Sequence, residues 1–231
     1  MSSKQNIFET GKIFLINKPI GWTSFDVVKR IRSLVKVKRV GHAGTLDPLA
    51  TGLLIVCTGK FTKRIHEFMS LEKEYSGSLI LGSRTPTYDL ESEPGNFKSY
   101  SHLTEEVIRL TAEQFTGEIL QVPPIHSAIK VDGERSYKLA RQGSQVDHQP
   151  RKIFIREFVI SNIEMPSIDF RVVCSTGTYI RSLVNDFGEA LGCGAYLSSL
   201  CRLRIGEYSI KDSLSIEQAT INIREMTDQN G

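Results

Sequence analysis

The sequence predicts a mixed α/β (α+β) fold, in which helices flank one twisted, mixed and largely antiparallel sheet. Short apolar runs such as Leu53 to Cys57 are typical of buried strands, whereas Val27 to Val35 carries apolar residues at helical spacing. The two kinds of segment alternate irregularly, and the Met165-Pro166 break separates two runs that can pair as a hairpin. Irregular alternation with hairpins favours a single mixed sheet covered by helices.

The strands are predicted from apolar runs that end at Gly, Pro or polar clusters. In chain order they are Ile13 to Ile16, Leu53 to Cys57, Glu74 to Leu81, Ile153 to Ile163, Ile168 to Cys174 and Leu197 to Ile205. Polar segments between them are expected to be loops: Val40 to Gly52, Arg84 to Tyr100 and Gly143 to Arg151, with a tight turn at Asp132-Gly133.

The helices are predicted from capping residues and helical spacing. Thr23 or Ser24 can cap a helix that has Asp26 in its first turn, and Thr104 can cap another that Gly117 stops. Further helices are expected after Thr62 through Met69, from Arg135 to Gln142, from Thr178 to Leu191 and from Ser215 to Met226.

Composition limits the class of protein. The 231 residues suit one domain spanning residues 1–231, without a separate C-terminal RNA-binding domain, and 40% hydrophobic residues can form its core. No apolar run reaches bilayer length and the N-terminus has no apolar signal core, so a cytoplasmic protein without a membrane partner is expected. The four cysteines form no CxxC pair, which favours buried thiols over a metal site or disulfides.

Charge gives weaker information, because the net charge is only +3. The basic residues gather in two stretches: Lys29, Arg30, Arg32, Lys36, Lys38 and Arg39, and then Lys60, Lys63 and Arg64. Such clusters can follow a nucleic-acid backbone or form a solvated helix face, and both interpretations stay open.

The densest group of conformationally special residues is Gly41 to Gly52, which contains Asp47. Glycines permit positive φ and close approach of another chain, and Pro48 restricts the main chain of Asp47. A rigidly held acid beside a buried strand is a candidate catalytic group. The alternative is a turn in which Asp47 only accepts bonds from nearby amides.

This stretch, GHAGTLDPLATG, resembles the signature loop of the TruB-type tRNA pseudouridine synthases. Four further blocks resemble the family's motifs in the same order: Asn17 to Ser24; Lys73 to Tyr75; Gln121 to Pro124 with Ser127 to Lys130; and Cys174 to Leu183 with Leu191 to Ala195.

The resemblance implies a pseudouridine-synthase-like catalytic domain that acts on a uridine in the T-loop of tRNA, conventionally position 55. The uracil is detached from ribose at N1, turned, and rejoined through C5. The family uses no cofactor and no metal. The expected partner is therefore the T-arm of tRNA, bound by a monomer.

By resemblance Asp47 is the essential carboxylate, which could attack the sugar, attack the base or remove a ribose proton. Arg181 matches the family's partner of that aspartate, where a guanidinium favours the charged form. Tyr75 matches a tyrosine whose ring lies against the uracil. The alternatives are an exposed helix arginine and an ordinary strand tyrosine.

The other matched residues are expected to bind substrate. His42 matches a histidine that fills the space left when the base is flipped out of the stack. Tyr179 matches a tyrosine that contacts the base, and Leu200 an apolar wall of the uracil pocket. Lys18 and Lys130 could contact phosphate, support the loop, or simply be solvated.

The sequence departs from the family pattern at three positions. His126 stands where a tyrosine is common, Pro86 where an aspartate is common, and Cys201 where the family often has the first of two arginines. The last difference removes one expected phosphate contact. Without an extra domain, the protein is expected to hold mainly the T-arm.

Two other functions remain open. One is an RNA-binding or folding factor that no longer catalyses, although the intact Asp47, Tyr75 and Arg181 argue against it. The other is an N-glycosidase, which normally needs a second acidic group to activate water. The matched motifs contain no second carboxylate.

Overall fold

The computed structural model describes residues 6–125, 130–131, 134–135 and 148–229. The described chain forms two compact units. Unit 1 comprises residues 1–75 and 200–231, and unit 2 comprises residues 76–199. The long strands β4 (Lys73–Leu81) and β10 (Ala195–Ile205) each pass from one unit into the other.

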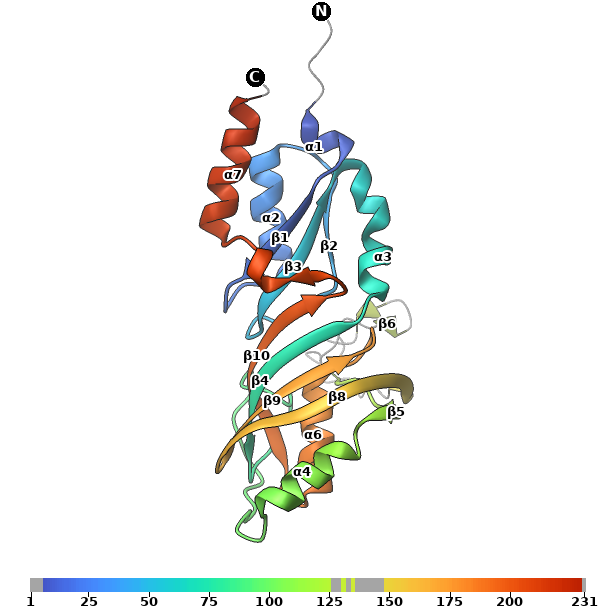
Figure 1. Cartoon of the computed structure of the whole chain (residues 1–231), viewed down its shortest axis with the longest axis vertical. Helices are drawn as coiled ribbons and strands as arrows, with labels where there is room; N and C mark the ends of the chain where they lie inside the picture. Colours follow the sequence, from blue (N-terminus) through green and yellow to red (C-terminus); the bar gives the residue numbers. More distant parts are fainter. Residues whose placement is uncertain (1–5, 126–129, 132–133, 136–147, 230–231) are drawn as a thin grey trace, which may run out of the picture. The chain divides into compact units, whose positions relative to one another are not determined.

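In unit 1 helices pack around the strand β3 (Figure 1). Its elements are α1 (Ile7–Thr10), β1 (Ile13–Lys18), α2 (Ser24–Val35), β2 (Val40–Ala43), β3 (Thr51–Thr58), η1 (Gly59–Arg64), α3 (Ile65–Ser70), β11 (Tyr208–Ser209), η2 (Ile210–Asp212) and α7 (Ile216–Asp228).

Strand β3 is the centre of unit 1. It pairs antiparallel with β1 and β2, and parallel with β10 at Cys201↔Thr51 and Arg202↔Gly52. Seven of its eight residues are buried, because both of its faces are covered. The sheet is therefore mixed, because β3 has both antiparallel and parallel partners.

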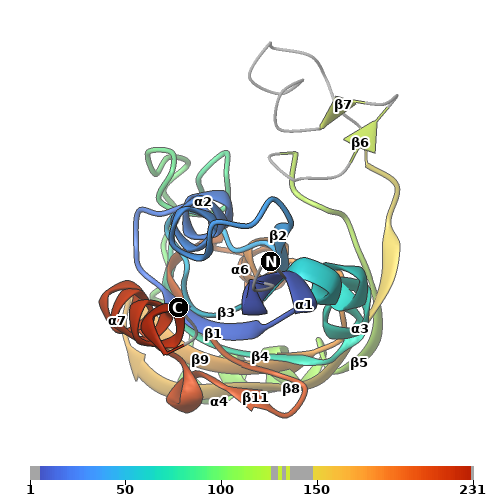
Figure 2. The same ribbon diagram turned by 90° about the horizontal axis from the view of Figure 1, so that it is seen from above.

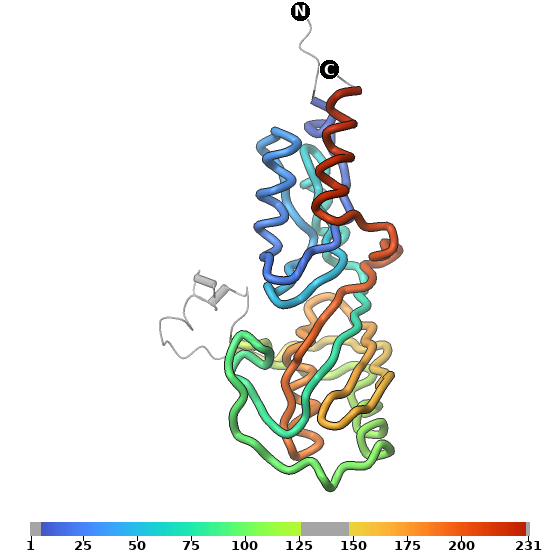
Figure 3. The backbone as a smooth tube through the Cα atoms, turned by 90° about the vertical axis from the view of Figure 1, so that its left-hand side faces the viewer, coloured from blue at the N-terminus to red at the C-terminus, as the bar shows by residue number. Residues whose placement is uncertain are grey.

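Successive side chains of β3 enter two different cores, as the period of two requires. Leu54 and Val56 pack with α2, β1 and α7, whereas Leu53 and Ile55 pack with Phe68 of α3. Helices α2 and α7 lie next to each other on the first face, and α3 covers the second (Figures 2 and 3).

Unit 2 continues the sheet in the order β10-β4-β9-β8-β5. Its further elements are α4 (Glu105–Glu113), β5 (Gly117–Gln121), β6 (Lys130–Val131), β7 (Glu134–Arg135), β8 (Arg151–Glu164), β9 (Ser167–Cys174) and α6 (Ile180–Ala190). Strands β8 and β9 form a long antiparallel hairpin around Met165-Pro166.

Aromatic rings join the helices of unit 2 to its sheet. Phe158 of β8 lies 5.3 Å from Phe187 of α6 and 5.9 Å from Phe170 of β9, measured between ring centroids. Phe115, just after α4, contacts both Phe158 and Phe187 edge to face. Such edge-to-face pairs stabilise a core beyond the apolar area that they bury.

The predicted mixed fold is confirmed, and each predicted strand is present within a few residues of its expected bounds. The helices expected after Thr23, after Thr104, from Thr178 and from Ser215 are also present, and Thr23 and Thr104 are their N-caps in the first two cases.

Two local predictions are wrong. Val40–Ala43 was expected in a loop, but it forms β2 because its main chain pairs with β3. Thr62 does not cap α3; it lies inside the 3-10 helix η1, and Arg64 occupies the N-cap position. The turn at Asp132-Gly133, most of the helix expected from Arg135 to Gln142, and residues 143–147 of the loop expected from Gly143 to Arg151 lie outside the described residues.

Candidate active site

Asp47 lies on a short loop, residues 44–50, that joins β2 to β3. The loop bends back on itself, because the amide of Ala50 donates to the carbonyl of Asp47 at 3.1 Å. Gly44 and Gly52 have φ values of 88° and 100°, in the left-handed region that favours glycine. Asp47 itself is partly exposed.

Lys18 holds this loop from inside unit 1. Its ammonium donates to the carbonyls of Trp22 at 2.6 Å, Pro19 at 3.1 Å and Pro48 at 3.2 Å. The side chain is fully buried, and this burial lowers the pKa of Lys18 from 10.5 to about 8. The nearby Asp47 acts against this shift, because its negative charge favours the ammonium form.

The start of α2 holds the loop from a second side. Thr23 and Asp26 form a capping box, which places Ser24 at the first turn of the helix. The Ser24 hydroxyl accepts from the Leu46 amide at 2.9 Å and donates to the Leu46 carbonyl at 3.2 Å. The residue before Asp47 is therefore bonded at both of its main-chain groups.

Arg202 of β10 provides the third attachment. Its Nε donates to the carbonyl of Leu53 at 2.7 Å, and its Nη2 donates to the carbonyl of Gly44 at 3.1 Å. The resemblance to the family implied phosphate contacts from two arginines at positions 201 and 202, the first of which is Cys201 here. Arg202 is only 1% exposed, so its guanidinium serves the main chain of unit 1 instead.

The remaining unit 1 candidates lie on strands. His42 is on β2 opposite Val56 of β3, and it is partly exposed. Tyr75 is on β4 and Leu200 on β10, and each is 9% exposed. The hydroxyl of Thr51, at the start of β3, donates to the carbonyl of Leu200 at 3.3 Å.

Arg181 lies in unit 2, in the first turn of α6, and is 4% exposed. Its Nη1 donates to the carbonyl of Thr87 at 3.1 Å, and its Nε lies 3.6 Å from Oδ2 of Asp89. The other oxygen of Asp89 accepts from the Glu91 amide at 3.0 Å. The alternative of an exposed helix arginine is therefore wrong.

Asp89 was missed as a functional candidate. It lies in a polar segment that was expected to be a loop, where an aspartate normally indicates only a turn. Only the structure singles out Asp89, because its side chain is buried beside the buried Arg181. Buried charges are normally paired.

Tyr179 precedes α6 and is fixed by Gln121 of β5. The Gln121 side chain accepts from the Tyr179 amide at 2.8 Å and donates to the Tyr179 carbonyl at 3.0 Å. Lys130 lies in β6, and its side chain is outside the described residues.

The structure thus brings together Lys18, Asp47 and Arg202 within unit 1, and Arg181 with Asp89 within unit 2. The pair of Asp47 with Arg181 joins residues of different units and stays a prediction.

Two protein-family models match consecutive parts of the chain. The model described as TruB family pseudouridylate synthase (N terminal domain) matches residues 32–180. The model described as tRNA pseudouridylate synthase B C-terminal domain matches residues 181–229.

Similar proteins and structures agree with these matches. The protein named tRNA pseudouridine synthase B of Flavobacterium johnsoniae is 50% identical over 89% of this chain and 93% of its own length. The protein of the same name of Bacteroides fragilis is 49% identical over 90% and 91%.

A chain in a solved structure titled as a Cbf5-Nop10-Gar1 complex is 28% identical. Its TM-score is 0.75, and the match covers 97% of this chain but only 57% of that one. A chain in an H/ACA RNP bound to a substrate RNA is 25% identical with a TM-score of 0.72, covering 97% and 56%.

The protein is therefore a pseudouridine synthase, an isomerase. More particularly, the chain belongs to the TruB family of pseudouridylate synthases. Within residues 6–229, as far as they are described, no helix is long and apolar enough to cross a membrane.

Proposed function

We propose that the protein isomerises a uridine of the tRNA T-loop, at position 55, to pseudouridine, and that Asp47 is the catalytic carboxylate. The observation that carries this proposal is a partly exposed aspartate whose loop is attached to Lys18, Ser24 and Arg202 at several main-chain groups. A group held in this way needs little reorganisation during the reaction. The tRNA substrate follows from the names of the relatives at about 50% identity.

In the proposed reaction the bond between N1 and C1′ breaks and a bond between C5 and C1′ forms. The proton on C5 leaves to water, and N1 takes up a proton, so no oxidant, reductant or hydrolysis is needed. Asp47 acts on the sugar or on the base, or removes a ribose proton. Because chemistry at N1 requires an unstacked base, the uridine is flipped out of the T-loop, at a cost of a few kcal/mol.

The other residues have supporting roles in this proposal. Arg181 orients the Asp47 carboxylate and favours its charged form, and Asp89 in turn orients Arg181. Tyr75, Tyr179 and Leu200 enclose the uracil. Three further residues contribute around this centre: His42, which fills the vacated stack; Lys18, which supports the loop; and Lys130, which contacts phosphate.

The test is release of tritium from tRNA that carries the label at C5 of uracil. Wild-type protein is expected to release it to water, whereas Asp47→Asn should slow release at least about 1000-fold, as loss of a catalytic nucleophile or base does. Binding of tRNA by Asp47→Asn should change little. Asp212→Asn, which alters an exposed aspartate of η2, is the matched control and should react like wild type.

Four results would contradict the proposal. Wild-type release by Asp47→Asn removes the catalytic role. Free uracil among the products indicates an N-glycosidase, and tRNA binding without any release indicates a non-catalytic binding factor. A substrate without uridine at position 55 should lose the signal; an undiminished signal places the reaction elsewhere.

A further inference from the structure

Arg202 is among the largest fully buried side chains of the described residues, although it carries a charge. A buried guanidinium is stable only when its donors find acceptors, because removing the charge from water is costly. Here the acceptors are two main-chain carbonyls. The burial of Arg202 is therefore explained by its hydrogen bonds to the carbonyls of Leu53 and Gly44.

The two carbonyls belong to the two flanks of the Asp47 loop. Gly44 is the first residue after β2, and Leu53 lies in β3 just beyond the loop. Asp47 is between them. One rigid planar group thus sets the distance between the point where the chain leaves β2 and the point where it has entered β3.

The backbone of Arg202 is fixed as closely as its side chain. Arg202 is paired with Gly52 in the parallel contact between β10 and β3. A Cβ added to Gly52 would lie 2.4 Å from the Arg202 carbonyl oxygen, so the two main chains approach as only glycine permits. A Cβ added to Gly44 would lie 3.5 Å from Nη1, so the guanidinium packs directly against the loop.

Lys18 and Arg202 act on the same loop from different strands. Their charges repel, and Arg202 contributes to the lowered pKa of Lys18. Two cations are therefore held close together in the interior of unit 1. Both side chains donate hydrogen bonds to carbonyls of the Asp47 loop or of the segments beside it, which accounts for both being retained there.

We infer that Arg202 is a positioning residue for the reaction: by bonding both flanks of the 44–50 loop it fixes where Asp47 presents its carboxylate. This inference rests on the proposed function, because it takes Asp47 as the catalytic group. It assigns Arg202 no contact with RNA or with the reacting atoms.

The test uses Arg202→Lys, which keeps the charge but has one ammonium in place of the two-pronged donor. Amide hydrogen exchange should quicken at least about 10-fold at two loop residues, Leu46, whose amide bonds to the Ser24 hydroxyl, and Ala50, whose amide bonds to the Asp47 carbonyl. It should stay unchanged at Leu54 in β3. Single-turnover tritium release should slow about 100-fold, as small misplacements of a catalytic group do, while the Kd for tRNA stays within about threefold.

Arg109→Lys is the matched control. Arg109 also donates to a main-chain carbonyl, that of Ile160 at 2.6 Å, but it lies in unit 2 on α4. This variant should turn over at the wild-type rate. Arg202→Met removes all donors and, if this variant folds, should quicken amide exchange in the loop more than Arg202→Lys does. If Arg202→Met does not fold, Arg202→Lys alone provides the test.

Two outcomes overturn the inference. Unchanged exchange at Leu46 and Ala50 in Arg202→Lys means that the guanidinium does not hold the loop. Faster exchange with wild-type turnover means that the loop geometry does not govern the reaction. Failure of the proposed function gives a different result: Asp47→Asn would then retain turnover. The exchange measurement on Arg202→Lys does not depend on activity.

Discussion

The ammonium of Lys18 is fully buried among three main-chain carbonyls, and its pKa in the folded protein is lowered to about 8. In the unfolded chain the same group returns to its ordinary value of 10.5. Between these two pH values the unfolded state binds more protons than the folded state, so the free energy of unfolding rises with pH. Below about pH 8 both states are charged, and the full cost of burying the charge is present.

We therefore expect wild-type protein to gain stability relative to Lys18→Met as the pH rises from 8 to 10.5. The gain is at most about 3 kcal/mol, from the size of the pKa shift. Urea unfolding of both proteins across this range measures the difference, and other titrating groups largely cancel between them. A difference that is flat or falls with pH would show that the Lys18 pKa is not lowered.

Single residues were predicted unevenly from sequence. Asp47 was singled out by local features, the glycines that permit positive φ and Pro48 that restricts its main chain, together with the resemblance of this stretch to the family's signature loop; its catalytic role stays a prediction. The roles of Arg202 and Asp89 were not identifiable. Each depends on acceptors or a partner far away in the chain, Gly44 for Arg202 and Arg181 for Asp89, which only the folded sheet and loops bring near.

Among the elements, α2 connects a local sequence signal to the candidate site. Its capping box, Thr23 with Asp26, brackets Ser24, whose hydroxyl bonds both main-chain groups of Leu46. Fraying of this helix end should therefore weaken the hydrogen bonds that hold Leu46, the residue next to Asp47.

Thr23→Ala is expected to lower the free energy of unfolding by about 1 kcal/mol, because an amide of the first turn loses its acceptor. It should also quicken amide exchange at Leu46. Thr23→Ser is the control, since its hydroxyl can still accept from the Asp26 amide. Equal stability of Thr23→Ala and Thr23→Ser in thermal unfolding would mean that the cap does not hold α2.

One element that the sequence did not predict, β2, is made by distant pairing. β2 has only four residues, two of which are Gly41 and His42, and nothing local indicates a strand. It forms because β3 offers an edge next to it. The 3-10 turn η1 was likewise hidden, because Thr62 is a good capping residue that here bonds back to the carbonyl of Gly59.

At the scale of the whole molecule, the fold class followed from the mixture of short apolar runs and helical periodicity. The strand order did not. β10 lies between β3 and β4, so strands from opposite ends of the sequence become neighbours. This strand order brings Arg202 to the Asp47 loop. It cannot be predicted from the periodicity of any single segment.

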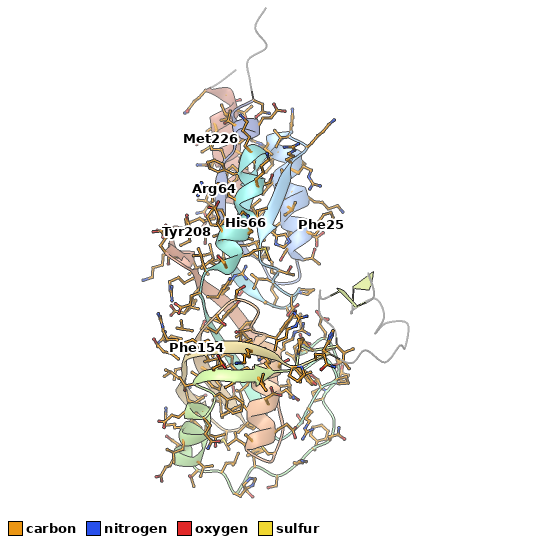
Figure 4. The ribbon with its side chains drawn as sticks, turned by 90° about the vertical axis from the view of Figure 1, so that its right-hand side faces the viewer. Phe25, Arg64, His66, Phe154, Tyr208 and Met226 are labelled. Carbon is orange, nitrogen blue, oxygen red and sulfur yellow. The ribbon has the colours of Figure 1, made fainter. Side chains whose placement is uncertain are left out.

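The charge distribution gives the last prediction. The net charge is only +3, so binding of tRNA must depend on local clusters such as Lys60, Lys63 and Arg64 around η1. Both lysines are exposed, whereas Arg64 lies 2.9 Å from Glu67 and over the rings of Phe61 and Phe68. Figure 4 labels Arg64 at the end of η1, His66 in the adjoining α3, and Phe25 on α2.

We expect the double variant Lys60→Ala/Lys63→Ala to weaken tRNA binding and to flatten its salt dependence. Each lost phosphate contact should reduce the slope of log K against log salt by about 0.7–0.9. Arg64→Gln should change the slope less, because its guanidinium is already engaged by Glu67 and two rings. Lys211→Ala, which removes an exposed lysine from η2, is the control. If the double variant keeps the wild-type slope, the cluster around η1 is only a solvated face, and the phosphate contacts must come from the other basic stretch, on and after α2.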